Sequence, residues 1–148
     1  MRSNYRRTAD WLKACGKRPS PENLSIQIGC HLEEFAEFIE AVDFSGVADT
    51  KASIVLALNG LANDLKRNGL VRASIRVERR EDALDALCDA EVTGNGVAYL
   101  AGFNKEAADE AVICSNEDKL VDGKPVILPG GKIGKPEGWK PPNLRNFV

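Results

Sequence analysis

The chain has a single histidine, four scattered cysteines and no apolar run near the roughly 20 residues that span a bilayer. One histidine excludes histidine-rich metal centres, including di-iron bundles that need a Glu-x-x-His motif on two helices. The cysteines form no C-x-x-C pair, so a zinc site has no support and free thiols are expected. The first residues contain no apolar signal segment. These absences predict a cytoplasmic protein without disulfides or membrane spans.

Net charge is also nearly absent, because 20 basic residues stand against 22 acidic ones. This balance excludes a broad basic surface for duplex nucleic acid and a polybasic membrane anchor. With 43% apolar and 28% charged residues, the composition is that of a folded globular protein rather than a disordered chain. The length fits one hydrophobic core.

Basic residues are missing from two long stretches of the chain. No lysine or arginine occurs between Arg18 and Lys51, or between Arg80 and Lys105, although both stretches are rich in aspartate and glutamate. The segments around them are basic. The small net charge is therefore the sum of two acidic and three basic segments.

Apolar residues at spacings of three and four predict five helices. The expected ranges are about 5–14, 21–42, 50–65, 81–100 and 105–115. Ser20 followed by Pro21, and Asn104, are typical helix starts. Asp49 or Thr50 is expected to cap the third helix. Its end is expected at Asn68 and Gly69.

Beyond Lys119 the helical spacing stops, and G-K-P, P-G-G-K and K-P-P segments indicate turns and extended chain. The sequence predicts an all-α fold, an antiparallel bundle of four to five helices with an extended irregular C-terminal tail. Residues 1–118 are expected to form the helical domain, and residues 119–148 a tail rich in lysine, glycine and proline that packs on it.

The acidic residues of each stretch fall on one helix face. The first face holds Glu33, Glu37 and Glu40, with Glu34 at its border, and the second holds Asp82, Asp85 and Asp89. Like charges at these spacings destabilise a helix by about 0.2–0.5 kcal/mol per pair. Clusters of oxygen ligands suit hard cations such as Mg²⁺ or Mn²⁺, which remove the repulsion. The pattern predicts a metal site of the kind used in phosphoryl chemistry.

Phosphoryl chemistry also needs cations for the phosphates, and the tail supplies them. Its lysines lie among glycines that let the backbone approach a ligand closely: Lys119, Lys124, Lys132, Lys135 and Lys140.

Four blocks of sequence, in order, resemble the MazG-like all-α NTP pyrophosphatases, a superfamily that includes the phosphoribosyl-ATP pyrophosphohydrolases. The blocks are E-E-x-x-E at Glu33, Glu34 and Glu37, an acidic block from Asp85 to Asp89, S-N-x-x-K from Ser115 to Lys119, and G-K-I-G-K-P-E-G-W-K-P-P in the tail. Ala86 stands where the second motif of the family has a glutamate, so either Asp85 with Asp89 or Asp82 with Asp85 would supply the acids. The helix near 50–68 looks like an insertion relative to the family.

The resemblance implies a Mg²⁺-dependent hydrolase that cleaves a nucleoside triphosphate to the monophosphate and pyrophosphate. It implies metal ligands at Glu34, Glu37, Asp85 and Asp89, and a catalytic Glu33 that orients or deprotonates the attacking water. Phosphate contacts are implied for Asn116 and Lys119, and tail charge adds Lys132 and Lys135 as candidates that close over the substrate. A homodimer or higher homo-oligomer is also implied.

Other interpretations remain open from the sequence. The chain could be an inactive helical protein that binds nucleotides or a partner, or its substrate could be phosphoribosyl-ATP. Asn116 could instead form a helix C-cap, and Lys119 could be a solvated lysine. Trp139 could stack on a base or pin the tail to the helices.

Overall fold

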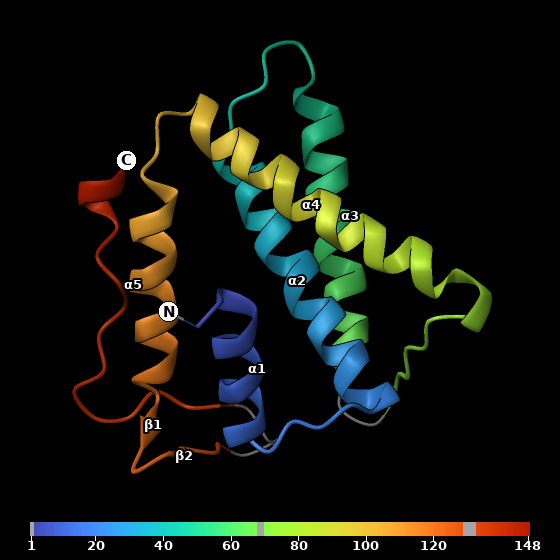
Figure 1. The fold of residues 1–148 in the computed structure, drawn as a ribbon. Helices are drawn as coiled ribbons and strands as arrows, with labels where there is room; N and C mark the ends of the chain where they lie inside the picture. Colours follow the sequence, from blue (N-terminus) through green and yellow to red (C-terminus); the bar gives the residue numbers. More distant parts are fainter. Residues whose placement is uncertain (1, 68–69, 129–132) are drawn as a thin grey trace. The chain divides into compact units, whose positions relative to one another are not determined.

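The computed structural model describes residues 2–67, 70–128 and 133–148, and its regular structure is almost entirely helical (Figure 1). Its helices are α1 (Asn4–Ala14), α2 (Pro21–Ala41), α3 (Ala48–Leu65), α4 (Arg80–Leu100) and α5 (Lys105–Glu117). Two short strands, β1 (Leu120–Val121) and β2 (Lys124–Pro125), and two 3₁₀ turns, Val77–Arg79 and Arg145–Phe147, complete the elements. The predicted all-α class is therefore confirmed.

Local capping explains where several helices begin. The Ser20 hydroxyl accepts from the backbone N–H of Asn23, and Pro21 occupies the first helical position of α2. The Asn104 side chain caps α5 in the same way through Ala107. The predicted cap of α3 at Asp49 or Thr50 is wrong, because α3 already begins at Ala48 and has no side-chain cap. Its expected end at Asn68 and Gly69 lies outside the described residues.

The chain divides into two units, which we describe separately. The hairpin unit consists of the described residues of Pro19–Ile75, and therefore holds α2 and α3. The tail unit consists of the described residues on either side of this segment, and holds α1, α4, α5 and the two strands.

In the hairpin unit, α2 and α3 run antiparallel and meet through small side chains (Figure 1). The buried residues along this seam are Ser25, Gly29 and Ala36 of α2 and Ala62 of α3. A Cβ atom on Gly29 would lie 2.8 Å from the carbonyl oxygen of Ala62, so only glycine fits at this distance. The Ser25 hydroxyl donates to the carbonyl of Leu65 at 2.9 Å and fixes the register of the two helices.

In the tail unit, α1 packs against α5 and the end of the chain runs back along α5 (Figure 1). The Trp139 indole N–H donates to the Ser115 carbonyl, near the end of α5. Eight residues later, the Phe147 carbonyl accepts from the backbone N–H of Asn104, at the start of α5. Residues 139–147 therefore follow α5 in the opposite direction.

A tight hairpin opens the tail. Strands β1 and β2 are antiparallel, with Val121 opposite Lys124, so the turn contains only Asp122 and Gly123. Both turn residues have positive φ, 52° and 72°, as a type I′ turn requires. The sequence predicts turn chemistry here, but not the strands, because two-residue strands carry no periodicity.

Within the described residues, no helix combines the length and the apolarity needed to cross a membrane.

Candidate functional site

The acidic residues of α2 lie in the hairpin unit, and they differ in how much of each side chain is exposed. Glu34 and Glu37 are exposed, whereas Glu33 is half-buried beside α3. The Glu33 carboxylate accepts a 2.6 Å hydrogen bond from the ammonium of Lys66, the residue that follows α3. The Lys66 side chain is only 24% exposed and that of Glu33 is 40% exposed. Glu33 therefore has a fixed orientation, and Glu34 and Glu37 present their carboxylates to solvent.

The acidic residues of α4 lie in the tail unit. Asp82 forms a 2.7 Å ion pair with Arg79 in the preceding turn. Asp85 and Asp89 are exposed, and no ion pair to them occurs in the part of the chain that the structure describes. Asp82 is therefore paired with a neighbouring arginine, whereas Asp85 and Asp89 present their carboxylates to solvent.

These carboxylates do not gather into a metal centre within one unit. Among residues 2–67, 70–128 and 133–148, no group of three or more histidine, cysteine, aspartate or glutamate side chains could hold a metal ion. The predicted ligands are all oxygen donors, which is the donor chemistry that Mg²⁺ prefers. They occur as one exposed pair on α2 and another on α4.

Three of the four predicted phosphate-binding residues come together at the end of α5. The Lys119 ammonium donates to the side-chain carbonyl of Asn116 at 2.8 Å, so this carbonyl is a hydrogen-bond acceptor rather than a helix cap. The C-cap of α5 is Asp118. Lys135, in the tail, contacts the same aromatic ring as Lys119. Lys132, the fourth residue, lies outside the described residues.

That shared ring is Trp139. The Lys119 ammonium lies 5.2 Å and the Lys135 ammonium 4.7 Å from the centroid of the Trp139 ring, so both make cation–π contacts. The indole N–H donates to the Ser115 carbonyl at 2.9 Å. Of the two roles left open for Trp139, pinning the tail to the helices is the one that these contacts show.

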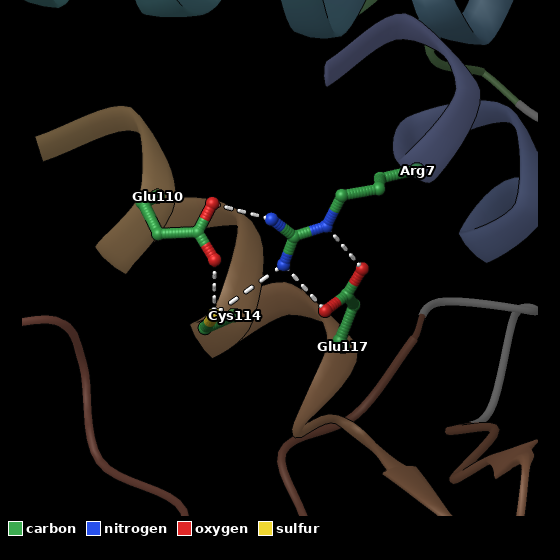
Figure 2. A network of polar contacts seen from close by, with 4 residues as sticks. All are labelled: Arg7, Glu110, Cys114 and Glu117. Atoms are coloured by element: carbon green, nitrogen blue, oxygen red, sulfur yellow. Dashed lines mark hydrogen bonds and ion pairs between the residues drawn. The ribbon is translucent and has the colours of Figure 1, made fainter. Parts of the chain in front are cut away.

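A second polar cluster joins α1 to α5, and Figure 2 shows its four side chains. The Arg7 guanidinium donates to both carboxylate oxygens of Glu117, at 2.8 and 2.7 Å, and to Glu110 and the Cys114 sulfur. These bonds raise the pKa of Arg7 above its ordinary value, the largest contribution coming from Glu117. Hydrogen bonds from Arg7 lower the pKa of Glu117, and bonds from Cys114 and then Arg7 lower the pKa of Glu110. Each of the three guanidinium nitrogens has an acceptor on α5, so the cluster joins the two helices.

None of the four cysteines, all of which the structure describes, forms a disulfide, as the sequence predicts. Burial raises the pKa of the Cys15 thiol, although Lys17 and Lys119 act in the opposite direction. Cys15 is therefore a core thiol rather than an activated nucleophile.

The sequence does not predict two contacts that the structure shows, that of Lys66 with Glu33 and that of Arg7 with α5. Lys66 was part of a predicted helix, but its contact with Glu33 depends on the register between α2 and α3. For Arg7 the sequence shows only that it lies in a basic segment, with no motif that predicts its partners on α5. The sequence predicts a role for Trp139 but does not predict that two lysines lie over its ring.

Comparison of the chain with protein-family models, with curated proteins and with solved structures finds no match in any of the three.

Proposed function

We propose that this chain is a Mg²⁺-dependent nucleoside triphosphate pyrophosphohydrolase of the MazG-like type, which releases a nucleoside monophosphate and pyrophosphate. The observation that carries the proposal is the meeting of Lys119 and Lys135 at the Trp139 ring, with Asn116 accepting a hydrogen bond from Lys119. These residues come from the end of α5 and from the tail, and together they bring two ammonium groups to one ring. Paired ammonium groups suit the phosphates of a nucleotide.

The two exposed acidic pairs support the metal part of the proposal. Glu34 and Glu37 on α2, and Asp85 and Asp89 on α4, are the residues that would hold Mg²⁺. The bound ion supplies positive charge to the phosphate oxygens, which lowers the cost of attack on a triphosphate.

Glu33 has a separate role in the proposal. Its carboxylate is held by the Lys66 ammonium at 2.6 Å, so its free oxygen has a defined direction. A carboxylate that is held in one orientation can accept a hydrogen bond from the attacking water and orient it. Lys66 would then be a positioning residue that acts through Glu33.

The test is the release of pyrophosphate from a panel of NTPs and dNTPs by the purified chain with Mg²⁺. We expect monophosphate and pyrophosphate in equal amounts from at least one nucleotide. Replacing Glu37 by glutamine should lower the rate by about 100-fold or more, because a metal ligand is lost.

Glu40→Gln is the matched control, since Glu40 is an exposed acid on the same helix but outside the E-E-x-x-E block. Its rate should stay within about twofold of the original chain, as expected for a surface change away from a site. Equal losses for Glu37→Gln and Glu40→Gln in folded proteins would contradict the proposed roles.

The ion pair between Glu33 and Lys66 also favours a second candidate, a protein of the same fold that binds nucleotides without hydrolysing them. A carboxylate whose cation is already supplied by the chain has less need of a metal. This candidate predicts that a nucleotide binds with Mg²⁺ while no pyrophosphate appears. Calorimetric titration with a nucleotide alongside the release assay separates the two.

A homodimer belongs to the proposal as well. Helix α4 carries large exposed apolar side chains, with Leu84 at 64% and Leu87 at 58% exposure. A second copy of the chain could cover them, since contiguous exposed apolar side chains are typical of association surfaces. Light scattering at defined concentrations measures the mass directly.

A further inference from the structure

We propose that Trp139 is a positioning residue that holds Lys119 and Lys135 as a two-lysine clamp for the polyphosphate end of the substrate. The inference rests on the proposed function for the identity of the ligand. It adds the residue that builds the phosphate-binding surface and the way in which that residue acts.

The geometry brings two positive charges close together. Both ammonium groups lie about 5 Å from the same ring centroid, 5.2 Å for Lys119 and 4.7 Å for Lys135. They are therefore within about 10 Å of each other. Because a charge-assisted hydrogen bond spans roughly 2.8 Å at each end, one pyrophosphate group can accept from both lysines.

The ring is held in place independently of the lysines. Its indole N–H donates to the carbonyl of Ser115, a buried residue of α5. The hydroxyl of Ser115 in turn donates to the Lys140 carbonyl, next to Trp139 in the tail. With the indole edge fixed to α5, the negative face of the ring remains for cations.

Lys119 has a second reason for its position. It lies just beyond the C-terminus of α5, where the helix dipole and the Asn116 carbonyl both attract a cation. A structural role would therefore explain Lys119 without any ligand.

Lys135 has neither a helix C-terminus nor a side-chain carbonyl to explain its position, so it is the residue whose substitution tests the clamp. Gly134, the residue before it, donates from its backbone N–H to the Val126 carbonyl at 2.7 Å. Within the described part of the chain, Lys135 has no ion-pair partner, and its cation–π contact places it near another positive charge. Like charges at this separation repel, and a polyanion removes the repulsion.

The test is the affinity for inorganic tripolyphosphate, measured by calorimetric titration of the full chain in the presence of EDTA. Lys135→Gln should weaken binding by about tenfold, since one charge-assisted contact is lost. Trp139→Leu should weaken it by a similar factor, because both lysines lose the ring. Trp139→Phe keeps an aromatic face while losing the indole N–H, and should stay within about threefold of the original chain.

Lys124→Gln is the matched control, because it removes one exposed tail lysine from β2, outside the clamp. It should change the affinity by less than about twofold at physiological salt. Equal effects of Lys135→Gln and Lys124→Gln would overturn the clamp.

Equal losses for Trp139→Phe and Trp139→Leu would overturn the role of the ring, since they would show that only the anchor to Ser115 matters. Lys135→Gln alters an exposed side chain, so it keeps the test decisive even where Trp139→Leu fails to fold.

The outcome is separable from that of the proposed function. Binding that follows the predicted order, in a chain that releases no pyrophosphate from any nucleotide, supports the clamp and rejects the enzyme. Pyrophosphate release that is insensitive to Lys135→Gln, with tripolyphosphate affinity unchanged, supports the enzyme and rejects the clamp.

Discussion

Arg7 is the side chain through which α1 is attached to α5, and its contacts have a clear electrostatic character. Its side chain is only 15% exposed and its guanidinium forms a two-point contact with Glu117. The same guanidinium reaches Glu110, about two helical turns earlier, so it satisfies two acids that would otherwise repel each other (Figure 2). The cluster is therefore a structural device rather than part of the candidate site.

This cluster makes the stability of the tail unit depend on pH. The pKa values of Glu117 and Glu110 are lowered from their ordinary value of 4.5. A group with a lowered pKa contributes stability above its unfolded pKa, and this contribution is lost as the pH falls through the folded value. Arg7→Gln should therefore lower the thermal midpoint at pH 7, and the difference from the original chain should shrink below about pH 4.5.

Circular dichroism melts between pH 7 and pH 3 measure this difference. Arg6→Gln is the control, because Arg6 is an exposed arginine on the same helix. A difference between Arg7→Gln and the original chain that is as large at pH 3 as at pH 7 would show that charge pairing is not its cause.

Side-chain pairs are the part of the molecule that the sequence could not predict. Lys66 and Glu33 are 33 residues apart, and they meet because two helices pack in one register. Lys119, Lys135 and Trp139 meet because the tail returns along α5. Periodicity and capping describe neighbours within one helix, and say nothing about which side chains face each other across two elements.

At the scale of elements, the hairpin of α2 and α3 depends on the absence of a side chain at Gly29. A Cβ there would lie 2.8 Å from both the Ala62 carbonyl oxygen and the Cγ of Lys66, and one of these atoms is backbone that cannot easily move. By contrast, a Cβ at Gly60 of α3 would meet no atom within 4 Å. The two glycines therefore have opposite requirements in the same pair of helices.

Alanine at these positions should change stability in opposite directions. Gly29→Ala should lower the free energy of unfolding by about 1–2 kcal/mol, because overpacking costs up to about 3 kcal/mol and the gain in helix propensity is about 1 kcal/mol. Gly60→Ala should raise it by about 0.5–1 kcal/mol, since only the propensity changes. Urea denaturation measures both, and a stabilised Gly29→Ala variant would contradict the close approach of the helices.

The elements themselves were largely predictable. Helix α2 begins at the predicted Ser20 and Pro21, and α5 at the predicted Asn104, because caps are local signals. The cap of α3 lies two or three residues before the predicted Asp49 or Thr50, since Val47 precedes the helix without a side-chain cap. Strands β1 and β2 were missed because only their turn, Asp122 and Gly123, leaves a mark in the sequence.

At the scale of the whole molecule, charge is distributed between segments rather than mixed. The acidic stretches became the exposed carboxylates of α2 and α4, and the basic tail became the lysines beside Trp139. On the proposed function, the acids serve the metal and the lysines serve the phosphates. A near-neutral net charge of −2 is then the result of two opposite requirements.

Mg²⁺ should accordingly stabilise the folded chain. A ligand that binds only the folded state adds about 2.7 kcal/mol at 100 times its Kd, which corresponds to a rise in the thermal midpoint of roughly 5 °C or more for a chain of this size. Glu37→Gln should reduce this rise, because one carboxylate ligand is removed. Scanning calorimetry with MgCl₂, compared with NaCl at the same ionic strength, measures it. A midpoint that responds identically to both salts would contradict metal binding.

The most direct measurement is the initial rate of pyrophosphate release from NTPs and dNTPs with Mg²⁺, for the original chain, Asp89→Asn and Glu91→Gln. Asp89 and Glu91 are both exposed on α4, but only Asp89 belongs to the proposed ligand set. The proposed function predicts release from at least one nucleotide by the original chain and by Glu91→Gln, and a loss of about 100-fold or more for Asp89→Asn. A folded original chain that releases no pyrophosphate from any nucleotide of the panel would contradict it.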